Sequence, residues 1–355
     1  MNNSNSTHSN EQYSPEDRDI LLGSLFLYKK VIIAKQFNKI CIPLRWQPTK
    51  AIMRRAIESE IDRGRLDLDK IHKVLVELEG WGRQQIYLYK FMGGTTLQNQ
   101  WLDYDWVESN IQDNGMGEVF NITRPITSLN QSPLYTIQYD QAEGRLRFIW
   151  VLNRTKVTRE ELEDPPHPDF TANIDSTALE RLILRAYRET LVRDVTSFDW
   201  NIKTGDAMIM IRKLRGTKYK DEREKIRAEL RKVIPLTDFQ RLSISRLINN
   251  LRHIEEVVTT KLDLRPLSNA NGRLMMSTGN RHDVESDPQY SDILTTHRDR
   301  FTGRTAPIRW QLKRNQQIGM YLYAKKEDDH RIAINSQETE EDVRHVLRRI
   351  RTYCS

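Results

Sequence analysis

The chain is poor in the residues and patterns that usually disclose a protein's chemistry. Its 355 residues include two cysteines, Cys41 and Cys354, which lie far apart in the sequence and suggest neither a disulfide framework nor a cysteine-based zinc site. No apolar run approaches the ~20 residues that cross a bilayer, and the N-terminus, rich in Asn and Ser, has no basic-then-apolar signal peptide. We therefore expect an intracellular protein, cytoplasmic or nuclear, without a membrane segment.

Catalytic motifs are absent as well. The sequence contains no G-x-x-x-x-G-K-[ST], no G-x-G-x-x-G and no G-x-S-x-G, so nucleotide hydrolysis, dinucleotide binding and acyl transfer have no motif to support them. The eight histidines include no metal-ligand pair at helical spacing, and most have a Lys or Arg nearby, which disfavours a bound cation. His297-Arg-Asp299 occurs in kinase catalytic loops, but no glycine-rich phosphate loop accompanies it. We predict no catalytic residue, no metal ligand and no cofactor, which favours binding over catalysis.

The composition is that of a mildly basic globular protein. Lys and Arg total 56 against 49 Asp and Glu, which gives a net charge of +7, and 38% of the residues are hydrophobic. This apolar content can form a core, and the length predicts two or three domains from usual domain sizes.

The clearest local pattern is a strand, a turn, a strand and a basic helix in residues 195–234. Apolar side chains alternate in 196–203, a turn with a glycine follows, and 207–211 is apolar on both faces, as in a covered strand. From Tyr219 onward the apolar residues recur with the period of a helix. The same order returns in 321–352 without convincing residue identity, which favours a repeated strand-strand-helix unit.

These patterns predict an α+β fold with a helical N-terminal part, mixed α/β modules and a C-terminal antiparallel sheet closed by a helix. We expect a disordered tail at 1–13 and a helical domain at 14–92 that ends in a strand. A central α/β domain with the basic hairpin and helix should cover 93–235. A C-terminal α+β domain should cover 236–355 and include a long polar loop at 279–306, a length that is usually functional or mobile.

Capping residues predict where further helices begin. The first helix should run to about Gln36 and one in the central part to about Leu191. The helices within 49–82 could also form a helix-turn-helix that reads DNA, with Lys70 and Lys73 facing outward. The expected starts are Ser14, Thr49 and Asp67 in the N-terminal part, Thr158 and Asp175 or Ser176 in the central part, and Thr237 and Thr339 in the C-terminal part.

The densest basic cluster lies in the loop and helix after the second strand. The helix places Asp221 four residues before Lys225 and Glu224 three before Arg227, as on an ordinary solvated helix face. The loop has no interleaved acids, as a phosphate-contacting surface requires. We therefore predict a non-catalytic nucleic-acid-binding or assembly protein, for DNA or RNA. The predicted contacts are Arg212, Lys213, Arg215, Lys218, Lys220, Lys225, Arg227, Arg231 and Lys232, with Arg309 and Lys313 as secondary contacts.

The C-terminal strands offer a second basic surface. If their outward side chains share one face, aromatic residues would lie among cations, a pattern typical of surfaces that stack bases and hold phosphates. Another domain could cover the tyrosines instead. The residues concerned are Arg309, Gln311, Lys313, Tyr321, Tyr323 and Arg331.

Two alternatives to nucleic-acid binding remain open. The basic surface could meet an acidic protein, which would make the chain an interaction adaptor. A metal-dependent nuclease is the other alternative, because Gln311-Leu-Lys313 on a strand, with Asp292 and Asp299 before it, has the residue types that hold a metal and stabilise phosphate charge. The same residues are also typical of the solvent-exposed face of any amphipathic strand.

Overall fold

The structure is a computed structural model whose described residues form helices packed against one antiparallel sheet of twelve strands, so the α+β fold is confirmed. It describes residues 13–28, 30–40, 49–121, 134–160, 186–212, 219–268, 273–278, 283–297, 300–312, 316–325, 330–336 and 338–354.

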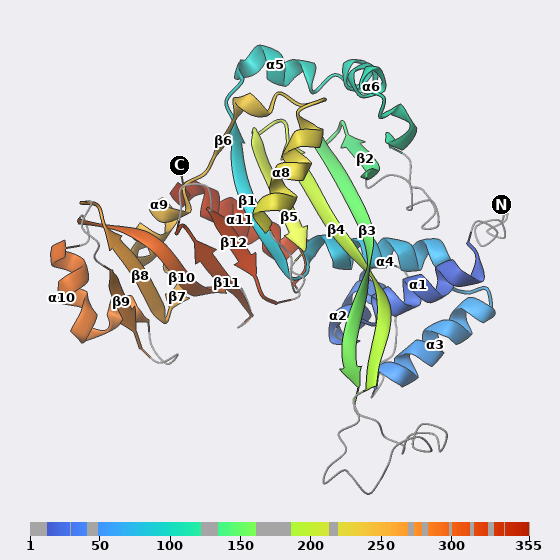
Figure 1. Cartoon of the computed structure of the whole chain (residues 1–355), viewed down its shortest axis with the longest axis horizontal. Helices are drawn as coiled ribbons and strands as arrows, with labels where there is room; N and C mark the ends of the chain where they lie inside the picture. Colours follow the sequence, from blue (N-terminus) through green and yellow to red (C-terminus); the bar gives the residue numbers. More distant parts are fainter. Residues whose placement is uncertain are drawn as a thin grey trace, which may run out of the picture.

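The helices and strands within these ranges follow the order shown in Figure 1. The helices are α1 (Pro15–Leu25), α2 (Lys30–Ile40), α3 (Lys50–Asp62), α4 (Leu68–Trp81), α5 (Gly94–Gln100), α6 (Tyr104–Asp113), α8 (Tyr219–Leu230), α9 (Ile244–Asn249), α10 (Pro288–His297) and α11 (Glu340–Cys354). The strands are β1 (Gln84–Phe91), β2 (Leu134–Asp140), β3 (Arg145–Glu160), β4 (Ala186–Asn201), β5 (Asp206–Arg212), β6 (Phe239–Arg241), β7 (Val257–Thr259), β8 (Lys261–Pro266), β9 (Leu274–Ser277), β10 (Phe301–Gln311), β11 (Gln317–Tyr323) and β12 (Arg331–Ile334).

Strand β1 joins the two halves of the sheet. The strand order is β2-β3-β4-β5-β1-β12-β11-β10-β8-β9, with β6 paired to β1 and β7 to β10. On one side of β1, Ile86 pairs with Met210 of β5, and on the other side it pairs with Ile332 of β12. Strands from all three expected domains therefore share one sheet, and the domain boundaries stay predictions.

The two strand-strand-helix units predicted from the sequence are present. They are β4, β5 and α8 in the first half and β11, β12 and α11 in the second. The first hairpin turns at Gly205, whose φ of 70° lies in the left-handed region that glycine adopts without a Cβ clash. Each unit pairs its second strand with β1, so the units flank this strand.

The two unit helices lie on opposite faces of the sheet. Alternate side chains of β1 point to opposite sides, so Tyr87 and Tyr89 lie on one face and Ile86 and Leu88 on the other. Tyr87 and Tyr89 share a buried cluster with α8, whereas Ile86 and Leu88 share one with α11. We call these the α8 face and the α11 face.

Helices cover the α11 face along the whole sheet. Helices α1 to α4 pack over β2, β3 and β4 through Tyr135, Ile149 and Val151, and α9, α10 and α11 pack over the C-terminal strands. On the α8 face, α5, α6 and α8 cover the first half of the sheet. On this face, α8 reaches β12 through the contact of Tyr219 with Arg331, and none of the described helices packs on β8 to β11.

Several expected helices are strands instead, so those predictions are wrong. Residues 158–160 belong to β3 and 186–191 to β4, and the two strands pair with each other, Thr158 opposite Arg188. The expected start at Thr237 is also wrong, because Phe239 pairs with Phe91 of β1 and the helix α9 begins only at Ile244. Pairing between distant strands overrides a local capping signal.

The polar stretch 279–306 is not a structureless loop. It contains α10, which begins at Pro288 and buries Leu294, and the first residues of β10 from Phe301 onward. Proline at a first helical position needs no backbone N–H donor, so it suits a helix start. The polar composition did not indicate this helix, because few of its residues face the core.

The N-terminal part also differs in detail. The expected single helix from Ser14 is two helices, α1 and α2. Tyr13 donates a hydrogen bond of 2.7 Å to Asp69, so order begins before the expected boundary, while residues 1–12 lie outside the described residues. Helix α4 is enclosed between its neighbouring helices and the sheet, and Lys70 pairs with Asp67 at 3.1 Å, which does not suit a helix that enters a DNA groove.

Among the helices that the structure describes, none combines the length and apolarity that a membrane crossing requires.

Two glycines of the C-terminal sheet test the packing of α9 on β10. A Cβ added at Gly303 would lie 2.4 Å from the Cβ and Cγ2 atoms of Ile248, so Gly303→Ala should destabilise the fold by about 1–3 kcal/mol. At Gly319 an added Cβ meets no atom of the described residues within 4 Å, so Gly319→Ala should keep the stability or raise it by about 0.5–1 kcal/mol. Urea unfolding measures both variants. Equal stabilities would contradict this packing.

Candidate nucleic-acid interface

Helix α8 is held on the sheet by apolar and polar contacts. Ile226 is buried against the strands, and Trp150 of β3 donates a hydrogen bond of 2.6 Å to Glu229. Arg223 is buried with its guanidinium carbon 4.9 Å from the ring centroid of Tyr87, a cation–π contact. These contacts fix which side of the helix faces solvent.

The charges of α8 largely cancel within the helix. Glu224 accepts from Arg223 at 2.8 Å and lies 3.4 Å from Arg227; burial opposes its charge, but the two arginines lower its pKa. The excess of positive charge comes from Arg231 and Lys232, which are exposed just after the helix. Within the helix, Lys220, Arg223, Lys225 and Arg227 stand against Asp221, Glu222, Glu224 and Glu229.

The structure places Arg212 apart from the predicted contacts on α8. Arg212 ends β5 on the α11 face, where its guanidinium carbon lies 5.4 Å from the ring centroid of Tyr28, so it does not adjoin α8. Arg227 is half-buried beside Glu224. The exposed predicted contacts on and after α8 are Lys220, Lys225, Arg231 and Lys232, and those outside the described residues are Lys213, Arg215, Lys218 and Lys313.

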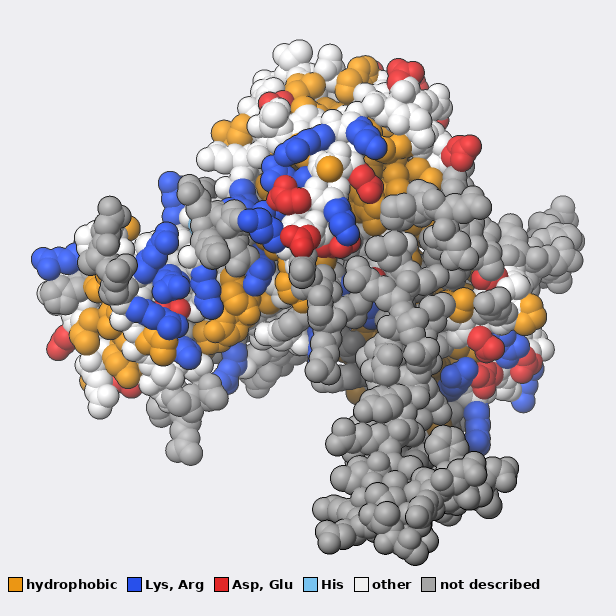
Figure 2. Space-filling model, in the orientation of Figure 1, with side chains coloured by type: hydrophobic (Ala, Val, Ile, Leu, Met, Phe, Trp, Pro, Cys, Tyr) orange, Lys and Arg blue, Asp and Glu red, His pale blue; other side chains and the backbone are white. Residues whose placement is uncertain are grey.

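The uncovered part of the α8 face brings together basic residues of several strands. Arg309 lies opposite Gly319, Tyr323 lies opposite Arg331, and Thr302 of β10 lies opposite Arg265. Figure 2 shows blue basic side chains with orange hydrophobic ones over these strands. We call this the open sheet surface: Lys261, Asp263, Arg265, Thr302, Thr305, Pro307, Arg309, Gln311, Gly319, Tyr321, Tyr323 and Arg331.

Asp263 is the acidic side chain of the open sheet surface, and its charge is already matched. It is 1% exposed and accepts from Arg273 Nε at 2.8 Å, from Arg273 Nη2 at 3.0 Å and from Thr305 at 3.2 Å. The hydrogen bonds that Arg273 donates to Asp263 raise the pKa of Arg273, whose side chain remains half exposed. The other charged side chains of this surface, Lys261, Arg265, Arg309 and Arg331, are all basic.

Aromatic rings lie in line among these cations. The rings of Tyr321 and Tyr323 stack with centroids 4.7 Å apart and planes 29° apart. Arg331 lies 4.5 Å from the ring centroid of Tyr323 and 5.5 Å from that of Tyr219, the first residue of α8. The line of aromatics therefore runs from the open sheet surface to the start of α8.

The sequence contained a signal for the residues that we did not select. The charged residues Lys261, Asp263 and Arg265 alternate with Leu262 and Leu264. A strand with one solvent-exposed face was therefore predictable there. The pairing of β8 with β10 was not predictable, because β10 lies well away from β8 in sequence. The shared face of Arg309, Gln311, Tyr321, Tyr323 and Arg331 agrees with the expectation from alternation.

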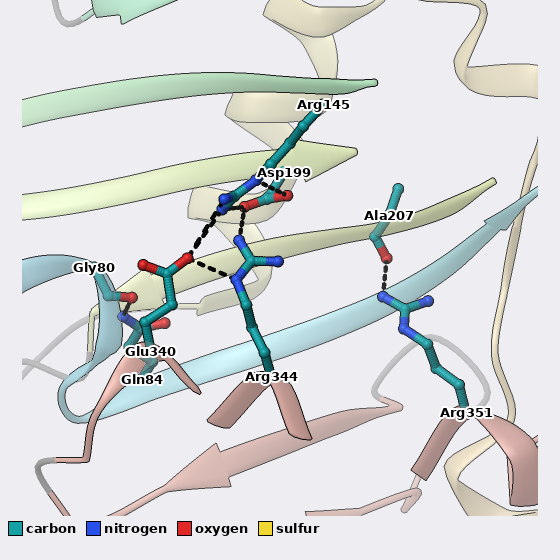
Figure 3. A network of polar contacts seen from close by, with 8 residues as sticks. All are labelled: Gly80, Gln84, Arg145, Asp199, Ala207, Glu340, Arg344 and Arg351. Carbon is teal, nitrogen blue, oxygen red and sulfur yellow. Dashed lines mark hydrogen bonds and ion pairs between the residues drawn. The ribbon is translucent and has the colours of Figure 1, made fainter. Parts of the chain in front are cut away.

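A second polar cluster lies on the α11 face and fastens α11 to the central strands (Figure 3). Asp199 of β4 is bound by Arg145 of β3 and by Arg344 of α11, the latter at 3.0 Å. Glu340 accepts from Arg344 at 2.6 Å and lies 3.4 Å from Arg145. Burial raises the pKa of Asp199, while Arg145 and Arg147 act in the opposite direction.

Arg351 makes a further link from α11 to the sheet. It donates to the backbone carbonyl oxygens of Tyr89 and Ala207, each at 2.9 Å. Beside it, a cavity of about 230 Å³ is lined by charged residues that pair with one another, among them Asp199, Asp206 and Arg344. We interpret this cluster as structural, since its charges are used to join elements.

The residues considered for a nuclease do not form a metal centre in the described part of the chain. No group of three or more His, Cys, Asp and Glu side chains that could hold an ion occurs there. Asp292 is exposed on α10 and Gln311 ends β10, while Asp299 lies outside the described residues.

Comparison of the chain with models of protein families and with the sequences of curated proteins finds no match.

The contact between Glu340 of α11 and Glu77 of α4 makes the junction sensitive to pH. Burial raises the pKa of Glu340 above its ordinary value of 4.5, and the charge of Glu77 and a hydrogen bond with it raise it further. A carboxyl group with a raised folded-state pKa contributes stability at low pH, and this contribution is lost as the pH rises through the folded-state pKa.

We predict that Glu77→Gln reduces the loss of stability that Glu340 causes as the pH rises, because it removes one of the causes of the raised pKa of Glu340. The free energy of unfolding of Glu77→Gln, relative to the unchanged protein, should therefore increase as the pH rises from about 4.5 toward neutrality. Urea unfolding across this range measures the difference, and other titrating groups cancel in the comparison. A difference that does not depend on pH would contradict the role of this pair.

Proposed function

We propose that the chain is a non-catalytic nucleic-acid-binding protein whose main contact is the open sheet surface. Helix α8 and the exposed residues Arg231 and Lys232 border that contact. The observation that carries the proposal is a sheet face with four cations, aromatic rings among them, and one carboxylate that is already bound by Arg273.

The physical argument is the attraction of this surface for a polymer of phosphates. Lys261, Arg265 and Arg309 lie on adjacent paired strands, so one backbone can reach several of them. Each phosphate that a cation neutralises releases a counterion, which makes binding tight at low salt and weak at high salt.

An acidic protein would be attracted by the same cations. The stacked pair Tyr321 and Tyr323 favours nucleic acid, because aromatic rings among cations offer stacking to bases in addition to charge. A partner protein that stays bound after nuclease treatment, on a chain that binds no nucleic acid, would favour the adaptor instead.

The test removes three cations of the open sheet surface together. Lys261→Gln, Arg265→Gln and Arg309→Gln should weaken binding to labelled single- and double-stranded DNA and RNA in anisotropy titrations between about 50 and 200 mM salt. Each lost phosphate contact flattens the plot of log affinity against log salt by about 0.9 for a duplex and about 0.7 for a single strand, so the slope should fall by roughly 2 to 3.

The matched control removes three exposed cations of the N-terminal helices. Arg55→Gln, Arg63→Gln and Lys73→Gln change the net charge by the same amount but lie on or beside α3 and α4. The control should keep both the affinity and the salt slope nearly unchanged. Equal losses in the two triple variants would mean that net charge alone drives binding, and no binding by the unchanged protein would refute the proposal.

A further inference from the structure

The open sheet surface has a notch beside its stacked tyrosines. Gly319 and Tyr321 occupy alternate positions of β11, so both lie on the α8 face. A Cβ added at Gly319 would meet no atom of the described residues within 4 Å, so they leave the space above this glycine open. The absence of a side chain leaves a gap along the strand next to the Tyr321 ring.

The walls of the notch differ in chemistry. One face of the Tyr321 ring packs against the Tyr323 ring, and the guanidinium of Arg331 packs on Tyr323. These two contacts support the Tyr321 ring, which forms the aromatic wall of the notch. Arg309, which is exposed, lies directly opposite Gly319 on β10. A flat ring that enters the notch would stack on Tyr321, and a phosphate attached to it would approach Arg309.

We infer that this notch is a base-stacking site for single-stranded nucleic acid, with Tyr321 as the platform and Gly319 as the opening. The inference rests on the proposed function and names its substrate class. In a duplex both faces of each base are already stacked on neighbours, so a base must be unpaired to use this site. The stacking is not sequence-specific, because every base has an aromatic face.

The experiment compares variants that leave the cations in place. Tyr321→Ala removes the platform and Gly319→Val fills the notch, and each should weaken binding to labelled oligothymidylate and oligouridylate by roughly 5- to 150-fold. Tyr321→Phe keeps the ring and should keep the affinity. Gly319 does not have a positive φ and valine suits a strand, so Gly319→Val should fold, which urea unfolding checks.

A duplex of matched length separates this inference from the proposed function. The unchanged protein should prefer the single strand, and Tyr321→Ala and Gly319→Val should each weaken binding to the single strand by a larger factor than binding to the duplex. If the cation variants weaken binding but folded Tyr321→Ala and Gly319→Val do not, the stacking site is wrong and the proposed function stands. A preference of the unchanged protein for the duplex would also overturn the inference, and failure to bind either polymer would refute both.

Discussion

The fold depends on the pairing of β1 with β5 on one side and with β12 on the other. This strand is buried on both faces, since Tyr87 packs under α8 and Ile86 packs under α11. Each neighbour of β1 belongs to a strand-strand-helix unit, and the two unit helices take opposite faces. Because α8 covers only the first half of its face, the same arrangement that closes the core leaves the α8 face of β8 to β11 without a helix in the described part of the chain.

Sequence reasoning succeeded where a pattern was both local and strong. The strand expected at the end of the 14–92 domain is β1, and the β4–β5 hairpin and the start of α11 after Thr339 were also recovered, because alternation, a turn glycine and a capping residue act over a few neighbours. It failed at residues 158–160 and at Phe239, where strand pairing with distant partners decided the outcome. It also failed at 279–306, since α10 buries few side chains and its composition is polar.

In the candidate site, too, local patterns were predictable from the sequence and contacts between distant segments were not. The outward alternation of Tyr321 and Tyr323 was predictable, and the rings do stack. The pairing of Arg227 with Glu224 was expected from their spacing on α8, and the structure shows that the buried Arg223 shares the same carboxylate. The contribution of β8 was missed, since only the three-dimensional register brings Lys261 and Arg265 beside β10. A surface made of single residues from several strands leaves no cluster in the sequence.

The central claim is that nucleic acid contacts the open sheet surface, and photo-crosslinking tests it most directly. An oligonucleotide with a photoreactive base would be irradiated with the full chain at low salt, and the crosslinked peptides would be identified by mass spectrometry. The account predicts crosslinks in β11, with Tyr321 the principal residue. Crosslinks confined to residues 213–218, or to α3 and α4, would contradict it, because the proposal does not assign those residues to the contact with the polymer.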